Sequence, residues 1–257
     1  MKKIGVFFGL IFFGFCSFQL VLGQESVFVE SVSLLECKVQ LPDDYNFDTS
    51  VPLLIGLHGG GGSYESFKDI GKHFDSPQFI FAVPEAPYEW MMEGKIGYDW
   101  SAWPTGDLKV MAKALKHTSD YIVNIIQSLT DKYNISEVYL LGFSQGSIIA
   151  QIAGIKNQKL LSGLIIFSGA PLNEMAQAPW SGPFMPDWPS EKSLKKANTL
   201  KIFMAHGKTD PLIDIKQARK SEEHYKGKGY ETIFFEFDGG HEVNKDAMKA
   251  VQDFIGK

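Results

Sequence analysis

Residues 138–147 read VYLLGFSQGS, an apolar run followed by a serine between two glycines. The apolar run is typical of a strand that is buried on both faces of a sheet, and residues 145–155 have the spacing of a helix. Ser144 would then lie on a sharp turn between a strand and a helix, where the flanking glycines leave room for the backbone. The alternative is an ordinary glycine-bounded turn, because a G-x-S-x-G pattern also arises by chance.

The same alternation of apolar runs and helical spacing extends along the rest of the chain. Such alternation predicts an α/β fold, in which a doubly wound, mostly parallel sheet is flanked by helices. The ligand-binding crevice of such a sheet lies at the carboxyl ends of its strands. We expect an early hairpin over 27–39, strands at 53–57, 79–83, 138–141, 164–167, 202–204 and 233–235, and helices at 63–74, 107–130, 145–155, 214–227 and 242–255.

The first residues have the pattern of a secretory signal peptide. Two lysines precede the almost wholly apolar stretch 4–22, and small or apolar residues stand before Gln24 at a position that suits cleavage. We therefore expect a signal peptide at 1–23, a single domain at 24–257, and a secreted or periplasmic protein. The alternative is an uncleaved anchor, because about 19 apolar residues can span a bilayer.

Cysteine usage and charge exclude several kinds of site. Cys16 follows the bulky Phe15 where a lipoprotein signal needs a small residue, so we expect no lipid anchor there. Cys37 would be the only cysteine of the mature chain, which leaves no internal disulfide.

The formal net charge of −5 offers no basic patch for nucleic acid and no cationic face for membranes. The histidines lack the spacing of metal ligands, so we expect no metal, and the oligomeric state stays open.

Three side chains suited to acyl transfer come shortly after predicted strands. They are Ser144, Asp210 and His241, in this chain order. A serine hydroxyl is a weak nucleophile until a histidine takes its proton, and the histidine needs a carboxylate to fix its tautomer. Each residue alone has a plainer interpretation as a turn or loop residue, but their ordered occurrence at strand ends favours catalysis. We predict Ser144 as nucleophile, His241 as base and Asp210 as its orienting group.

A run of four glycines follows the predicted strand at 53–57. No lysine closes this run, so it is not a phosphate-binding P-loop. A tetrahedral oxyanion needs preorganised N–H donors, and a glycine can bring its amide close to the substrate. We predict that the backbone amides of Gly60 and of Gln145, the residue after the nucleophile, form this oxyanion hole.

At these positions the sequence resembles the α/β-hydrolase superfamily, and within it the phospholipase/carboxylesterase group that includes the acyl-protein thioesterases. The resemblance implies a catalytic domain without a large lid and without a cofactor, which hydrolyses carboxylic esters or thioesters. It also implies Ser144, Asp210 and His241 as the catalytic triad, with Gly60 and Gln145 at the oxyanion hole. The motifs that carry it are LLIGLHGGGGS, AVPEAP, YLLGFSQGS, IIFSGAPL, MAHGKTDPLI and GGHEV.

Two features depart from the group. The glycine-rich loop differs from the commoner G-L-G-D type, and the expected export signal argues against a cytosolic depalmitoylating role. Export favours ester substrates outside the cytoplasm, either small molecules or glycan-linked esters such as feruloyl esters, by analogy alone.

Two aromatic-rich segments, 88–104 and 170–189, follow predicted strands and could form the walls of a substrate pocket. Aromatic side chains suit an acyl chain, an aromatic acid or a sugar ring. Long loops are more often functional than idle, although these aromatics could also only anchor the loops. The substrate-contact candidates are Trp90, Trp100, Trp103 and Trp180.

These observations predict a secreted serine esterase that hydrolyses carboxylic esters through an acyl-Ser144 intermediate. One alternative is a serine peptidase on the same fold. A second alternative is a non-catalytic carbohydrate-binding protein that has kept the fold.

Overall fold

The computed structural model describes residues 33–92, 94–169, 189–197 and 199–255. The chain divides into two units, Met1–Leu34 and Leu35–Lys257, and the fold below is that of the second. The expected signal peptide, with Cys16, and the substrate-contact candidate Trp180 lie outside the described residues. Within the described ranges, no helix is both long enough and apolar enough to cross a membrane.

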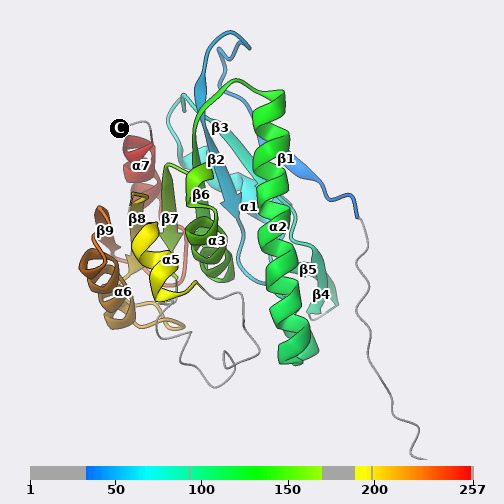
Figure 1. Cartoon of the computed structure of the whole chain (residues 1–257), viewed down its shortest axis with the longest axis vertical. Coiled ribbons are helices and arrows are strands. Elements are labelled where there is room, and N and C mark those ends of the chain that lie inside the picture. The colour runs from blue at the N-terminus through cyan, green and yellow to red at the C-terminus, as the bar shows by residue number, and fades with distance from the viewer. Residues whose placement is uncertain (1–32, 93, 170–188, 198, 256–257) are drawn as a thin grey trace, which may run out of the picture. The chain divides into compact units, whose positions relative to one another are not determined.

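A seven-stranded sheet forms the centre of the fold, in the order β1-β3-β2-β6-β7-β8-β9 (Figure 1). All neighbouring strands are parallel except β1, which pairs antiparallel with β3 at the edge. The mostly parallel sheet predicted from the apolar runs is therefore confirmed. The strands are β1 (Cys37–Gln40), β2 (Val51–Leu57), β3 (Ile80–Pro84), β6 (Ile135–Phe143), β7 (Gly163–Phe167), β8 (Lys201–Gly207) and β9 (Thr232–Phe237).

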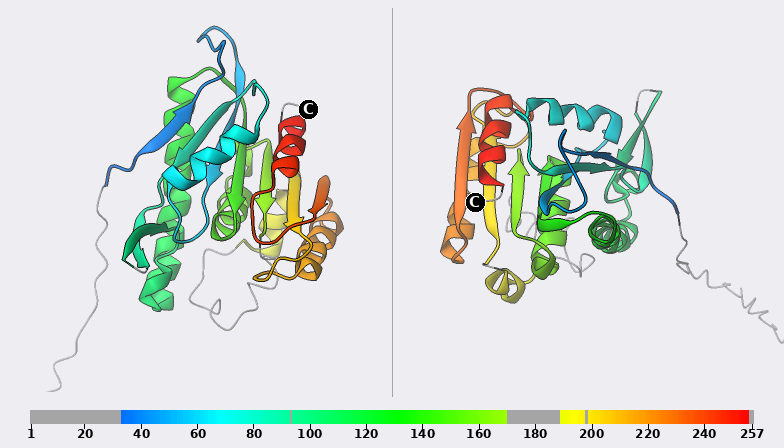
Figure 2. Two further views of the ribbon diagram at one scale, coloured as in Figure 1. Left: turned by 180° about the vertical axis from the view of Figure 1, so that it is seen from behind. Right: turned by 90° about the horizontal axis from the view of Figure 1, so that it is seen from above.

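Helices cover both faces of this sheet, as Figure 2 shows most clearly from above. One buried cluster joins the sheet to α2, α3, α5 and α6, and a second joins its other face to α1, η1 and α7. The helical segments are α1 (Tyr64–Phe67), η1 (Lys68–His73), η2 (Trp103–Thr105), α2 (Leu108–Lys132), α3 (Gln145–Lys156), η3 (Gln158–Leu160), α5 (Glu191–Lys196), α6 (Ile215–Gly227) and α7 (Lys245–Phe254).

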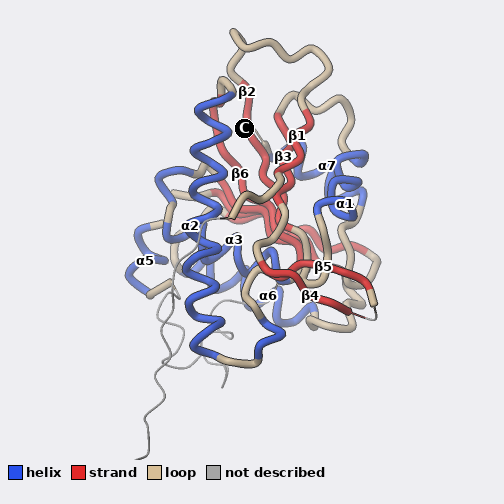
Figure 3. The backbone as a smooth tube through the Cα atoms, turned by 90° about the vertical axis from the view of Figure 1, so that its right-hand side faces the viewer, coloured by secondary structure: helices blue, strands red, loops and turns tan. Residues whose placement is uncertain are grey.

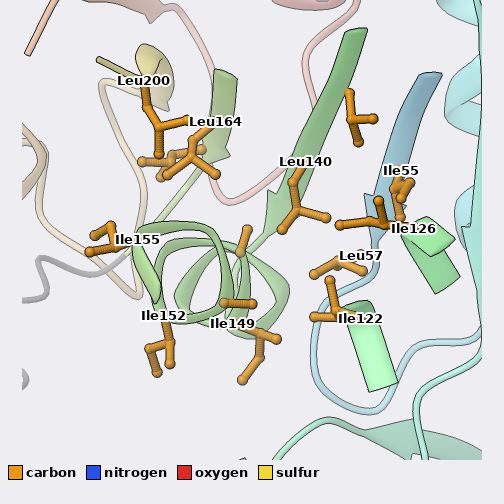
Figure 4. Close-up of a cluster of buried hydrophobic side chains, with 14 of the residues drawn as sticks. Ile55, Leu57, Ile122, Ile126, Leu140, Ile149, Ile152, Ile155, Leu164 and Leu200 are labelled. Carbon is orange, nitrogen blue, oxygen red and sulfur yellow. The ribbon is translucent and has the colours of Figure 1, made fainter. Parts of the chain in front are cut away.

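Helix α3 packs in the middle of one face and has apolar residues on all sides. Ile149, Ile152 and Ile155 of this helix lie among side chains from the sheet and from α2, including Leu140 and Ile122 (Figure 4). A helix that is apolar on all sides is not stable when exposed to water, so α3 must be buried between the sheet and the neighbouring helices. The buried helix fixes the position of its own first residue, which is the residue after Ser144.

The long helix α2 shows how local sequence sets an element's ends. Asp107 caps its start, because the carboxylate accepts hydrogen bonds from the amides of Lys109 and Val110. Buried positions such as Ile122 and Ile126 recur at helical spacing along the face that contacts the sheet.

Three differences from the predicted elements stand out. Residues 88–104, expected as a loop, contain an antiparallel hairpin of β4 (Tyr88–Met92) and β5 (Lys95–Asp99), which is separate from the main sheet (Figure 3). The short helix α5 was not predicted. The early hairpin expected over 27–39 is wrong for its described part, because Cys37–Gln40 pairs with the edge of the buried strand β3.

Candidate active site

Ser144 lies on the turn between β6 and α3 with a strained backbone. Its φ of 52° and ψ of −118° are unusual for a residue with a side chain, and its amide donates to the carbonyl of Phe167 at 3.0 Å. A methyl group on Gly146 would lie 2.3 Å from the carbonyl oxygen of Leu57, and one on Gly142 would lie 2.2 Å from that of Gly146. Both flanking glycines are therefore needed for the backbone to turn this tightly.

Asp210 and His241 form a hydrogen-bonded pair after β8 and β9. Oδ2 of Asp210 lies 2.8 Å from Nδ1 of His241, and Oδ1 accepts from the amides of Leu212 at 2.8 Å and Ile213 at 3.0 Å. A carboxylate accepts only, so Nδ1 of His241 carries a proton, and Nε2 has a free lone pair whenever the ring is neutral. The side chain of Asp210 is wholly buried and that of His241 is 14% exposed.

Two opposing effects act on the carboxyl of Asp210. Burial raises its pKa, but the hydrogen bonds from Ile213, His241 and Leu212 together outweigh burial and leave the pKa below its usual value. The carboxylate is therefore charged at neutral pH, as a group that stabilises an imidazolium must be.

His206 supports the same carboxylate from the strand itself. Its Nε2 lies 2.8 Å from the carbonyl oxygen of Ile213, which can only accept, so this nitrogen carries a proton. The same nitrogen lies 3.4 Å from Oδ2 of Asp210. His206 is buried, at 1% exposure, and holds the loop that carries Asp210 against the end of β8.

Phe143 brings the three predicted triad residues into one neighbourhood. The ring of His241 lies 5.0 Å from the ring of Phe143, the residue directly before Ser144. A methyl group on Gly59 would lie 3.1 Å from the Phe143 ring and 3.5 Å from Cβ of Ser144. The imidazole, the serine turn and the glycine loop thus meet at the carboxyl ends of the strands, where the α/β rule places a site.

The glycine loop lies directly against Gln145. A methyl group on Gly60 would lie 3.1 Å from Oε1 of Gln145, so the backbone of residue 60 passes close to this side chain. Gln145 is the first residue of α3, where an amide N–H has no partner within the helix. Two backbone segments that could donate to one oxyanion are therefore adjacent.

The side chain of Gln145 makes contacts that local sequence patterns did not indicate. Its Nε2 donates to Oδ2 of Asp99 at 2.6 Å and to Oγ of Ser101 at 3.1 Å, while its Oε1 accepts from the amide of Trp100 at 3.1 Å. These partners are 44 to 46 positions away in the chain, so only the folded structure brings them together. The sequence predicted a role only for the backbone amide of Gln145.

The tryptophan candidates have different environments. Trp100 is 0% exposed and its indole N–H donates to the carbonyl of His58 at 2.8 Å, so its prediction as a substrate contact is wrong and it is a core residue. Trp103 is 47% exposed, and Trp90 on β4 is partly buried. Both keep surface that a ligand could reach.

Other features of the described residues lie apart from these side chains. Two surface hollows of about 330 and 390 Å³ are lined by residues of β1, β3, η1 and their neighbouring loops, and none of the predicted catalytic residues lines them. Across the described ranges, no three His, Cys, Asp or Glu side chains are grouped as a metal site would need.

The chain is similar to proteins of one family. The sequence profile of the phospholipase/carboxylesterase family matches residues 47–257. Acyl-protein thioesterase 1 of Neurospora crassa is 26% identical over 214 residues, which cover 77% of this chain and 80% of the relative.

Among solved structures, esterase PE8 superposes with a TM-score of 0.65 at 18% identity and covers 86% of this chain and 97% of its own. Acyl-protein thioesterase 2 of Zea mays superposes with a TM-score of 0.60 at 16% identity, covering 85% and 96%. These likenesses confirm an α/β-hydrolase fold, and the residues that the structure describes contain no large lid. The profile match identifies a hydrolase of the carboxylesterase/thioesterase type. The chain belongs to the phospholipase/carboxylesterase family, in its acyl-protein-thioesterase-like group.

Proposed function

We propose that the protein is a serine esterase that hydrolyses carboxylic esters through an acyl-Ser144 intermediate. The observation that carries the proposal is the 2.8 Å contact between Asp210 Oδ2 and His241 Nδ1, with the imidazole packed against the residue before Ser144. This contact leaves Nε2 of His241 as the base, on the side of the ring away from the carboxylate.

The first half of the reaction acylates the serine. Nε2 of His241 takes the hydroxyl proton of Ser144 while Oγ bonds to the carbonyl carbon of the ester and the carbonyl electrons move to its oxygen. The amides of Gly60 and Gln145 would donate to this oxyanion. When the carbonyl re-forms, the carbon–oxygen bond to the alcohol breaks, and His241 returns its proton to the departing alkoxide.

The second half repeats these steps with water. His241 takes a proton from water, whose oxygen bonds to the acyl carbon, and the bond to Ser144 Oγ breaks as the serine regains a proton. One ester and one water give one acid and one alcohol. The buried carboxylate of Asp210 stabilises the imidazolium that forms twice in the cycle.

The identity of the substrate extends the proposal. The expected signal peptide at 1–23 favours secretion or the periplasm, and hence small-molecule or glycan-linked esters over protein thioesters. Of the aromatic candidates, Trp103 and Trp90 remain proposed substrate contacts, because both keep exposed surface, and Trp180 remains an expectation from the sequence.

Replacement of the nucleophile tests the proposal directly. We expect Ser144→Ala to lose p-nitrophenyl butyrate hydrolysis to the background rate and to lose labelling by a fluorophosphonate. Ser136→Ala is the matched control, because this exposed serine lies at the opposite end of β6, and it should keep both. Full activity of the Ser144 variant would overturn the assignment, a large preference for peptide substrates would favour the peptidase, and an unlabelled wild-type protein would favour the binding protein.

A further inference from the structure

The side chain of Gln145 connects the nucleophile turn to the base of the β4–β5 hairpin. We propose that Gln145 and Asp99 form a positioning pair that holds the two amides of the oxyanion hole at a fixed separation. This inference rests on the proposed function, because it concerns the geometry of the same hole.

The hydrogen bonds of the pair have a fixed direction. A backbone N–H can only donate, so the atom of Gln145 that faces the Trp100 amide at 3.1 Å must be its oxygen. A carboxylate can only accept, so the atom that faces Oδ2 of Asp99 at 2.6 Å must be its nitrogen. The side-chain amide therefore cannot turn over without losing both contacts.

Asp99 is a buried carboxylate whose other oxygen organises the segment after β5. The side chain is 0% exposed, and Oδ1 accepts from the amides of Ser101 at 2.8 Å and Trp103 at 2.9 Å. Burial of a carboxylate is costly unless its oxygens are hydrogen-bonded. The donation from Gln145 is thus part of what makes this buried charge tolerable.

The same segment is fastened to the glycine loop. Gly61 donates to the carbonyl of Tyr98 at 2.8 Å, Tyr98 donates to the carbonyl of Gly62 at 2.8 Å, and the Trp100 indole donates to the carbonyl of His58 at 2.8 Å. These bonds involve His58, which precedes Gly60 in the chain, and Gly61 and Gly62, which follow it. Residues 98–101 therefore bind the glycine loop through the backbone and the Trp100 indole, and bind the start of α3 through Gln145.

Loss of this connection would act on rate more than on substrate affinity. The two proposed donors belong to different elements, the loop after β2 and the first residue of α3, and each must lie within hydrogen-bond reach of one oxygen. Preorganised donors matter most where charge develops in the transition state, and removal of one donor typically lowers kcat about 10²–10³-fold. Asp99 touches neither substrate nor reacting atoms in this scheme, so it acts through Gln145 and through the segment that it organises.

A reciprocal exchange tests the pair. Asp99→Asn turns the donor of residue 99 toward the donor of Gln145, and Gln145→Glu sets two carboxylates against each other. In the double variant, the new side-chain amide at position 99 donates to the new carboxylate at position 145, so the bond between these two residues is reversed. The carboxylate at position 145 still accepts from the Trp100 amide, so that bond keeps its direction. We expect each single variant to lose about 10²-fold or more in kcat with KM changed less than about threefold, and the double variant to recover to within about tenfold of wild type.

The measurements separate positioning from stability and from the proposed function. All rates are taken well below each variant's Tm, where a purely structural role would leave kcat at the wild-type value. Affinity for a trifluoromethyl ketone, whose carbonyl becomes an oxyanion when Ser144 adds to it, should fall in the single variants and recover in the double variant. Gln127→Glu, at an exposed position of α2, is the control for the added charge. If Asp99→Asn does not fold, Gln145→Met carries the test, because methionine keeps the bulk but makes neither hydrogen bond.

Provided that Ser144→Ala is inactive, a wild-type kcat in the folded Asp99→Asn, Gln145→Glu or Gln145→Met variant would refute the positioning role of Gln145 and Asp99. A double variant no better than its worse parent also overturns it. Activity that survives in Ser144→Ala overturns the proposed function instead.

Discussion

Asp210→Asn offers the sharpest test of the candidate triad, because the structure dictates how the new amide must lie. Oδ1 of Asp210 accepts from two backbone amides, those of Leu212 and Ile213, so the oxygen of the asparagine stays there. Its NH₂ group then faces Nδ1 of His241, which must accept, and the proton moves to Nε2. In this tautomer Nε2 cannot take the proton of Ser144.

The size of the effect follows from the cost of the opposite orientation. A flipped amide would restore the tautomer but would leave two backbone N–H groups facing a donor, at about 1–3 kcal/mol each. The active orientation is therefore about 2–6 kcal/mol less favourable, which at about 1.36 kcal/mol per factor of ten lowers kcat by roughly 30-fold to roughly 25,000-fold. The lost charge that stabilised the imidazolium adds to this decrease.

The assay is the kcat for p-nitrophenyl butyrate at pH 8, with circular dichroism to establish that the variant is folded. Asp238→Asn is the matched control, because this exposed aspartate of the neighbouring loop pairs only at the surface, with Lys208 at 2.8 Å, and it should keep wild-type kcat. A folded Asp210→Asn protein within tenfold of wild type would refute the reasoning.

The lowered pKa of Asp210 also predicts how stability depends on pH. The unfolded chain, with the ordinary carboxyl pKa of about 3.9, binds this proton more readily than the folded chain does. Asp210 therefore contributes stability above that value, and the contribution disappears as the pH falls through its folded pKa. The unfolding free energy of wild type should decrease toward that of Asp210→Asn in acid urea titrations. A constant difference between pH 6 and pH 2 would contradict this linkage.

Three further outcomes are expected. Gly146→Ala should lower Tm by many degrees or prevent folding, because its methyl group would lie 2.3 and 2.5 Å from two backbone oxygens. The control Gly227→Ala has open space around the added methyl group, so its Tm should be unchanged or raised. Equal Tm values for the two variants would contradict this prediction. Burial raises the pKa of the Cys37 thiol to about 12, so iodoacetamide at pH 8 should label its peptide at least about a hundredfold more slowly in the native protein than in urea, as followed by mass spectrometry. Trp100→Phe should cost about 1–3 kcal/mol in urea unfolding, because it leaves the buried carbonyl of His58 without its 2.8 Å donor, and an unchanged unfolding midpoint would argue against that role.

The sheet could be predicted from the sequence because its central strands are buried on both faces. A strand buried on both faces needs apolar residues in succession, as in 53–57 and 164–167. Such a run can be recognised in the sequence without knowing which strand pairs with it. The strand-end rule then located Ser144, Asp210 and His241 at one edge of the sheet, since parallel strands share their direction.

The β4–β5 hairpin could not be recognised in the same way. Its register pairs Met91 with Ile96, and both side chains are largely exposed, at 71% and 61%, so apolar residues there do not mark a core. Two tryptophans of the aromatic-rich segment 88–104 also differ in burial. Trp100 is 0% exposed and Trp103 is 47% exposed, although they are only three positions apart in the sequence. Composition alone treats them as equivalent.

The identity of residue 145 has a physical explanation that the nucleophile turn alone does not give. An oxyanion donor at this position requires only a backbone N–H, which any residue but proline supplies. The contacts at the hairpin base require more: an acceptor for the Trp100 amide and a donor to Asp99, both at the end of a side chain long enough to reach them. Glutamate has the length but no donor, and asparagine has both groups but is one methylene shorter. Glutamine is therefore the residue whose side chain can make both contacts at the base of the β4–β5 hairpin. Replacement of Asp99 should change which residue is tolerated after the serine.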